Sequence, residues 1–191
     1  GDKIDLSLIE NDKKIKLINL RKNKGVGFAR QFGLKVSQFD YLFYLDSDVV
    51  MENQNTLKVL FDDFLSNKMF GSIGPVMSYH NLNKAYSSNF VAAKTCYGYD
   101  QEDPLIEFSG MRSECGLIEK NFLRSIGGWS FIPGAGGEEF VLGHRIIKAG
   151  KKNIVTKNTN YSTFYDNLLS SFSEIFVQSE LDKERIVEIT N

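Results

Sequence analysis

The chain has 191 residues, of which 42% are hydrophobic and 25% are charged, which excludes an intrinsically disordered protein. Lys and Arg total 23 and Asp and Glu total 24, so the net charge of -1 argues against a dedicated nucleic-acid-binding protein. The two cysteines, Cys96 and Cys115, form neither a metal-binding motif nor a disulfide framework, which favours a reducing compartment such as the cytoplasm. No apolar run is long enough to span a membrane.

The first part of the chain alternates strand and helix patterns. Residues 14–20 alternate polar and apolar side chains, which predicts a strand. A glycine turn follows, and the apolar spacing over residues 26–37 predicts a helix. Residues 40–45 (DYLFYL) form a continuous apolar and aromatic run, which is typical of a strand buried on both faces. An amphipathic helix is predicted around residues 57–65.

The second part continues the alternation. Residues 71–79 predict a strand that is irregular or lies at a sheet edge, because Pro75 cannot donate a backbone hydrogen bond. The further predictions are short strands at 105–108, 114–118 and 153–156, helices at 121–126, 138–150 and 168–176, and a loop at 132–137. This order predicts a single α/β domain over residues 1–191, with a mostly parallel, Rossmann-like central sheet flanked by helices.

Asp46-Ser47-Asp48 is the strongest chemical signal in the sequence. It directly follows the apolar run, and ligands of open α/β sheets sit beyond the carboxyl ends of strands. In an extended chain, Asp46 and Asp48 face the same way, so both carboxylates can address one ligand. Mg²⁺ and similar hard cations bind carboxylates together with substrate phosphates. The triplet therefore predicts a metal site for a diphosphate-bearing substrate, although a polar turn after a strand would look similar.

A second candidate lies at the predicted glycine turn and the helix after it. Asn23 and Gly25 open a helix whose first backbone N–H groups are free to bind an anion. Arg30 lies one turn into that helix, where it could meet a phosphate or brace a carboxylate such as Asp46. The alternative interpretation, that Arg30 is a surface residue after an ordinary strand–helix turn, remains open.

A third candidate follows the glycine-rich loop at residues 134–137. Glu138 and Glu139 begin the next helix, where a carboxylate could act as a general base or could merely complement the helix dipole, and both readings remain open. Gly137 would allow a ligand to approach the backbone closely. Trp129 is a candidate sugar-stacking platform or a core residue.

Taken together, these motifs resemble the GT-A-fold glycosyltransferases of family two. The resemblance covers roughly residues 15–155 and depends on the order and spacing of several motifs. The motifs are Asn23/Gly25, Ala29-Arg30, Tyr41 to Asp48, Gly127-Gly128-Trp129, Gly137-Glu138-Glu139 with Leu142 and Arg145, and Gly150. The Gly-Gly-Glu-Glu region is also similar to polypeptide N-acetylgalactosaminyltransferases.

The resemblance implies roles for individual residues. Asp46 would contact the nucleotide ribose or the metal, Asp48 would bind Mn²⁺ or Mg²⁺ on the diphosphate, and Arg30 would lie near the nucleotide. Glu139 occupies the position of the family's catalytic base, with Glu138 as its rival. The implied reaction is transfer of a hexosyl or N-acetylhexosaminyl group to an acceptor hydroxyl with inversion. A UDP-sugar is the favoured donor, and the acceptor would be a glycan or a lipid-linked glycan, as in polysaccharide biosynthesis.

Two features depart from the family pattern. The opening strand and turn that bind the nucleotide base are not in the sequence, so the domain is expected to be truncated at its amino end. No His occurs between residues 158 and 165, where many relatives complete the metal site. Two alternatives therefore stay open: another metal-dependent nucleotide-using enzyme, such as a nucleotidyltransferase, and a truncated domain without catalysis. Peripheral association with the inner face of a membrane is compatible with the sequence.

Overall fold

The structure is a computed structural model that describes residues 18, 20, 22–46, 49–77, 102–131 and 137–163. The helices are α1 (Val26–Val36), α2 (Thr56–Ser66), α4 (Lys120–Ser125) and α5 (Glu138–Lys148). The strands are β1 (Tyr41–Leu45), β2 (Val49–Met51), β3 (Phe70–Met77), β4 (Leu105–Phe108), β5 (Cys115–Glu119) and β6 (Lys152–Thr163). No helix within these ranges is both long and apolar enough to cross a membrane.

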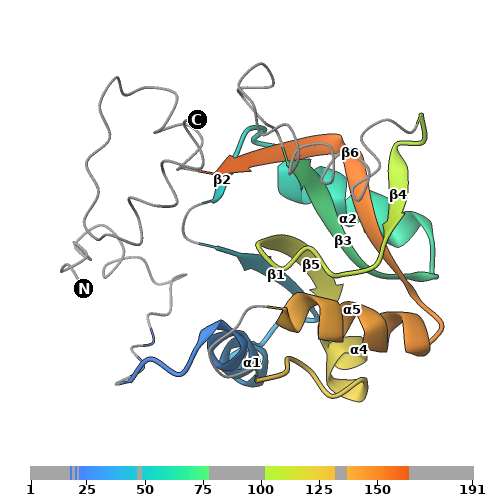
Figure 1. Cartoon of the computed structure of the whole chain (residues 1–191). Helices are drawn as coiled ribbons and strands as arrows, with labels where there is room; N and C mark the ends of the chain where they lie inside the picture. Colours follow the sequence, from blue (N-terminus) through green and yellow to red (C-terminus); the bar gives the residue numbers. More distant parts are fainter. Residues whose placement is uncertain are drawn as a thin grey trace, which may run out of the picture.

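The six strands form one sheet. Five of them follow the order β1-β5-β3-β6-β2, and β4 pairs with β6 (Figure 1). The predicted α/β architecture with flanking helices is confirmed, but the described part of the sheet is mixed and not mostly parallel. Among the described pairs only β3 and β6 run parallel. The reason is that β5 lies between β1 and β3 and runs against both, while β2 and β4 run against β6.

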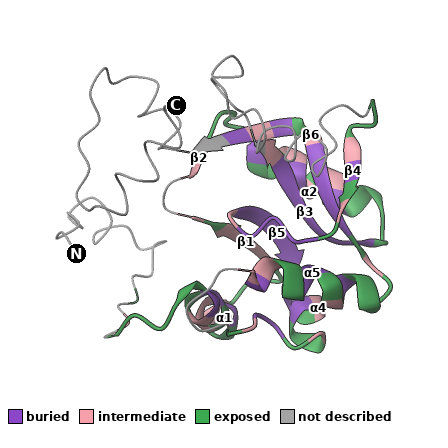
Figure 2. Cartoon of the chain, viewed as in Figure 1, coloured by how far each residue is buried: buried purple, intermediate pink, exposed green. Residues whose placement is uncertain are grey.

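Helices cover both faces of the sheet. In Figure 1, α1, α4 and α5 lie on one side and α2 lies on the other. Successive side chains of a strand point to opposite faces, so β5 supplies Ile118 to the core beside α1, α4 and α5 and Leu117 to the core beside α2. Figure 2 shows the buried residues concentrated in the central strands and on the inner sides of the helices. Burying each large aliphatic side chain contributes about 1.5–3 kcal/mol.

Strand β1 is less buried than its composition predicts. Leu42 and Tyr44 pack against one core and Phe43 packs against the other, so both faces do contact apolar layers. However, Tyr41 and Leu45 are 36% and 47% exposed, and the residues between them are half-buried. The prediction of a strand buried on both faces is wrong in degree, because β1 lies at the end of the order of described strands.

Two further strands differ from their predictions. Strand β3 lies between β5 and β6, so of the two alternatives expected from Pro75, an edge position or an irregular strand, the edge position is not the one found. The expected irregularity is present, since the register with β6 shifts between Pro75 and Val76, where the proline has no N–H to donate. Strand β6 has 12 residues and is much longer than the predicted strand at 153–156. The predicted helix at 168–176 and, apart from Ile18 and Leu20, the strand at 14–20 lie outside the described residues.

Candidate functional site

Asp46 directly follows β1, and its backbone is held on both sides. Its N–H donates to the carbonyl oxygen of Glu114 at 2.9 Å, which extends the pairing of β1 with β5 by one residue. Its own carbonyl oxygen accepts a hydrogen bond from the N–H of Val49 at 3.2 Å. The side chain remains 38% exposed, so the carboxylate is fixed in place and still accessible to a ligand. Asp48, the second predicted metal ligand, lies outside the described residues.

Helix α1 positions Arg30 beside Asp46. Gly25 precedes the helix with φ 86°, a left-handed conformation that favours glycine, and its N–H donates to Asn23 Oδ1 at 2.9 Å. Arg30 is only 8% exposed. Its Nη2 donates to both Asp46 carboxylate oxygens, at 2.8 and 3.0 Å, and its Nη1 donates to Glu138 Oε1 at 2.8 Å. One buried guanidinium therefore joins the end of β1 to the start of α5, and it braces Asp46 as the sequence suggests.

The two acids at the start of α5 have different surroundings. Glu138 is 4% exposed and is held by Arg30. Glu139 is half-buried, and within the described chain its carboxylate accepts a single hydrogen bond, from the N–H of Gly137 at 3.2 Å. Both lie in the first helical turn, where the helix dipole favours negative charge. Glu138 is thus committed to a buried ion pair, whereas Glu139 is the more accessible acid.

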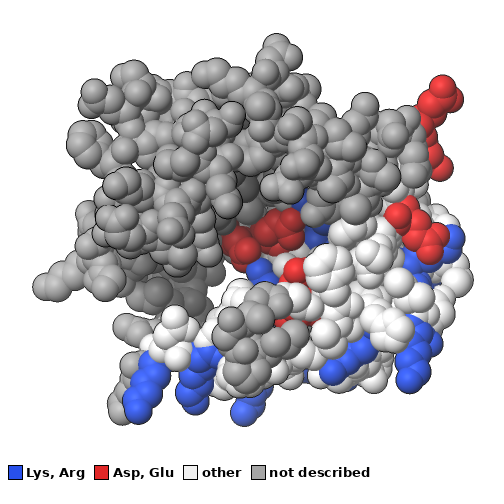
Figure 3. Space-filling model, viewed as in Figure 1, with Lys and Arg blue, Asp and Glu red and all other residues white. Residues whose placement is uncertain are grey.

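Charged side chains of both signs gather in the middle of one face of the molecule (Figure 3). Oxygen ligands of the Asp46 type suit a hard divalent cation, so the chemistry of this carboxylate fits the predicted metal. The described residues contain no group of three His, Cys, Asp or Glu side chains that could hold a metal ion. In this arrangement Arg30 supplies the positive charge next to Asp46.

Trp129 is 4% exposed and belongs to the core, so of the two alternatives left open by the sequence the structure favours a core residue over a sugar-stacking platform. Its ring lies 5.0 Å from the Arg30 guanidinium carbon and makes an edge-to-face contact with Tyr44, with ring centroids 5.1 Å apart. The ring therefore packs inside the protein and supports Arg30 by a cation–π contact. Burial raises the pKa of Tyr44 to about 12, although the charge of Arg30 opposes that shift, so the phenol is neutral at neutral pH.

The turn before Trp129 is tied to two helices. Gly127 and Gly128 both have positive φ, at 91° and 67°. Gln31 Oε1 of α1 accepts a hydrogen bond from the Trp129 N–H at 2.8 Å, and Arg145 Nη1 of α5 donates to the Gly128 carbonyl at 3.0 Å. Arg145 of α5 and Gln31 of α1 therefore hold this turn in place next to Trp129.

A second charged cluster joins the segment just before β5 to the end of β6, and no sequence motif marks it. Arg112 Nη2 pairs with Glu114 Oε1 at 2.6 Å, and the Tyr161 hydroxyl donates to the same oxygen at 2.8 Å. Arg112 also donates to the Tyr161 hydroxyl. Tyr161 comes from the far end of β6, so only the tertiary fold brings it to Glu114. The one signal in the sequence is an arginine two residues before a glutamate at the start of a strand.

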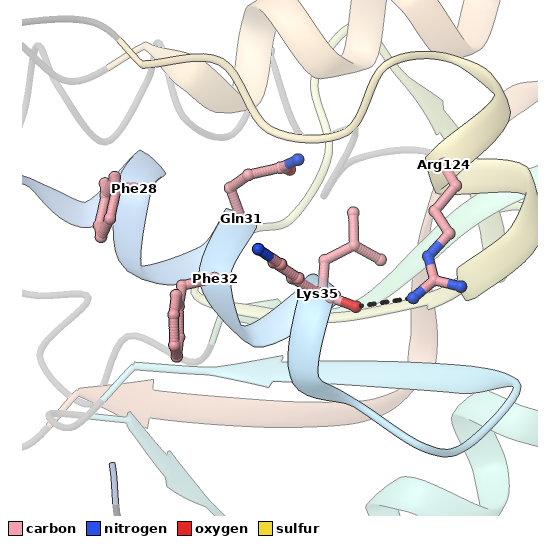
Figure 4. A pocket seen from close by; sticks show the side chains of 6 residues that line it. Phe28, Gln31, Phe32, Lys35 and Arg124 are labelled. Atoms are coloured by element: carbon pink, nitrogen blue, oxygen red, sulfur yellow. Dashed lines mark hydrogen bonds between the residues drawn. The ribbon is translucent and has the colours of Figure 1, made fainter. Parts of the chain in front are cut away.

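A cavity of about 470 Å³ lies apart from these clusters, beside α1 and α4 (Figure 4). It is lined by Phe28, Gln31, Phe32, Leu34, Lys35 and Arg124. Arg124 closes one side by donating to the Leu34 carbonyl at 3.4 Å. None of the predicted site residues lines this cavity.

A family model described as "Glycosyl transferase family 2" matches residues 4–122, which is more than half of the chain. The chain belongs to glycosyltransferase family 2. The matched region includes Arg30, Asp46 and the Arg112–Glu114 pair of the site. No curated protein matched the sequence.

Two solved structures share the fold of this glycosyltransferase domain. One is a mannosyltransferase from Pyrobaculum calidifontis in complex with GDP-Man and Mn²⁺, with 15% identity and a TM-score of 0.58 over 77% of this chain and 38% of that chain. The other is GalNAc-T7 with UDP, GalNAc and Mn²⁺, with 14% identity and a TM-score of 0.55 over 88% of this chain and 42% of that chain. These similarities show a GT-A fold, and the chain spans less than half the length of either enzyme.

Proposed function

We propose that this domain transfers a sugar from a nucleoside-diphosphate donor to an acceptor hydroxyl with the help of Mn²⁺ or Mg²⁺. The observation that carries the proposal is the bridge from Arg30 to Asp46 and Glu138, because it joins a donor-side carboxylate to the helix that bears Glu139. Membership of the family supports sugar transfer. Both solved structures contain Mn²⁺ with a nucleotide, which supports a metal and a nucleotide-sugar donor.

On this proposal the donor diphosphate lies at the end of β1. Asp46 and Asp48 would hold the divalent cation through carboxylate oxygens, and the cation would neutralise charge on the departing nucleoside diphosphate. Arg30 keeps the Asp46 carboxylate in one orientation through two hydrogen bonds. Trp129 and the Gly127–Gly128 turn keep Arg30 itself in place.

Glu139 is the proposed general base. It would take the proton of the acceptor hydroxyl as that oxygen attacks the anomeric carbon, and the nucleoside diphosphate would leave from the opposite side. A single displacement of this kind inverts the anomeric configuration. Glu138 is the weaker candidate, because its carboxylate is buried and engaged by Arg30. UDP-sugars are the first donors to test, with a glycan or lipid-linked glycan as acceptor.

The test is Glu139→Gln, which keeps the size of the side chain and its bond to Gly137 but removes the basic oxygen. Transfer should fall by about 100-fold or more, while calorimetry with UDP and Mn²⁺ should give an unchanged affinity. Glu107→Gln is the matched control, because Glu107 is exposed on β4 and pairs with Lys152 away from the site. Full transfer by Glu139→Gln would assign the base elsewhere. Absence of nucleotide binding to the unmodified protein would contradict the proposed function.

A further inference from the structure

We propose that Glu114 binds a hydroxyl group of the transferred sugar and thereby helps to select the donor. This inference rests on the proposed function, since it assigns a further contact within the same site. It is carried by the position of Glu114, by the way its carboxylate is held, and by the partial exposure of its side chain.

Glu114 lies directly across from Asp46. Its backbone carbonyl oxygen accepts the Asp46 N–H at 2.9 Å, immediately beyond the last paired residues of β1 and β5, Leu45 and Cys115. The same segment is tied to the proposed base, because the Met111 N–H donates to the backbone carbonyl of Glu139 at 3.2 Å. The backbone that carries Glu114 is therefore bonded both to the residue after β1 and to the first turn of α5.

The Glu114 carboxylate is held by two buried groups. Tyr161 is 0% exposed and Arg112 is also buried, and both contact the single oxygen Oε1. Burial raises the pKa of Tyr161, so its hydroxyl stays protonated and remains a donor to Glu114. Within the described chain both of these contacts are made to Oε1, and the Glu114 side chain is 28% exposed. Two buried groups therefore orient the carboxylate through Oε1, and on this proposal Oε2 accepts the hydrogen bond from the ligand.

The charges around Glu114 favour a neutral hydroxyl group as that ligand. Arg112 already supplies one positive charge to the carboxylate, so no further cation is needed to balance it. An ionised carboxylate accepts hydrogen bonds and donates none, which suits a sugar hydroxyl donor and repels a second carboxylate. The site is therefore expected to favour neutral sugars with a free hydroxyl over uronic acids. The competing explanation is that Glu114 is only the counter-ion of buried Arg112.

Calorimetry in the presence of Mn²⁺ separates these explanations. UDP is compared with UDP-glucose and UDP-glucuronate, and GDP with GDP-mannose, using the unmodified protein, Glu114→Gln and the control Glu107→Gln. The readout is the ratio of nucleotide-sugar affinity to nucleoside-diphosphate affinity. Removing the charged acceptor should lower this ratio for neutral sugars about 10-fold, because a hydrogen bond to a charged group is worth that much or more. The affinity for UDP or GDP alone should stay within about twofold of the unmodified protein, since neither contains the sugar.

Tyr161→Phe provides a second variant that retains both charges and removes only the hydroxyl that orients Glu114. It should lower the same ratio, and thermal melting shows whether either variant has unfolded. An unchanged ratio in a folded variant overturns the proposal for Glu114 and leaves the proposed function intact. An equal loss of affinity for UDP or GDP and for the nucleotide-sugar would assign Glu114 a merely structural or metal-related role. If the unmodified protein binds no nucleotide, the proposed function fails and this proposal fails with it.

Discussion

The ion pairs of Arg30 are expected to be a major source of stability at the site. In Arg30→Met the apolar length of the side chain is kept, but Glu138 loses its partner while it is 4% exposed. Removing one member of a buried pair costs about 3–5 kcal/mol, because the remaining charge stays desolvated. Loss of the ion pair with Asp46 adds about 1 kcal/mol at most to this cost, since the Asp46 side chain is 38% exposed and water screens the pair. We therefore expect a loss of about 3–5 kcal/mol in the free energy of unfolding, dominated by Glu138.

Urea denaturation measures this loss, and a double-mutant cycle with Glu138→Leu isolates the pair. Removing both charges should cost clearly less than the sum of the two single substitutions, with a coupling of about 0.5–3 kcal/mol. Lys35→Met is the matched control, because it makes the same kind of change on an exposed position of the same helix. A loss below about 1 kcal/mol for Arg30→Met, or additive single effects, would refute the reasoning, since either result would mean that Glu138 is not left buried and unpaired.

Further expectations follow from packing and titration. Gly143→Ala should destabilise the fold by about 1–3 kcal/mol, because the new Cβ would lie 2.5 Å from the Gly110 Cα. Gly33→Ala should instead stabilise α1 by up to about 1 kcal/mol, because a Cβ at this position would meet nothing within 4 Å. Urea denaturation midpoints compare the two variants. Burial raises the pKa of the Cys115 thiol to about 12, so in a variant lacking the other cysteine a disulfide reagent at about pH 8 should modify the folded protein far more slowly than the urea-unfolded one. The folded-state pKa values of Cys115 and Tyr44 lie above their ordinary values of 9.0 and 10.0. The stability that these groups contribute is therefore complete below those ordinary values and is lost as the pH rises toward 12. Urea titrations at increasing pH should show this decline, and a flat profile would contradict it.

Local patterns were sufficient to predict most of the elements. The spacing of Phe28, Phe32 and Val36 predicts α1, and the glycines at 127 and 128 predict the end of α4, because helix periodicity and left-handed turns are local properties. Strand directions were not predictable in this way. An apolar run such as β1 is compatible with parallel or antiparallel neighbours, and the choice of β5 as its partner is made by residues far away in the chain.

The same distinction between local sequence patterns and tertiary structure applies to the candidate site. By itself the sequence supplied the chemical groups: Asp46 after a strand, Arg30 one turn into a helix, and two acids at the start of another, as well as membership of glycosyltransferase family 2. Only the tertiary structure decided how they pair. It placed Glu138 rather than Glu139 on Arg30, put Trp129 inside the core, and joined Arg112, Glu114 and Tyr161. The physical reason is that ion pairs and burial depend on distances across the fold, which a linear pattern does not contain.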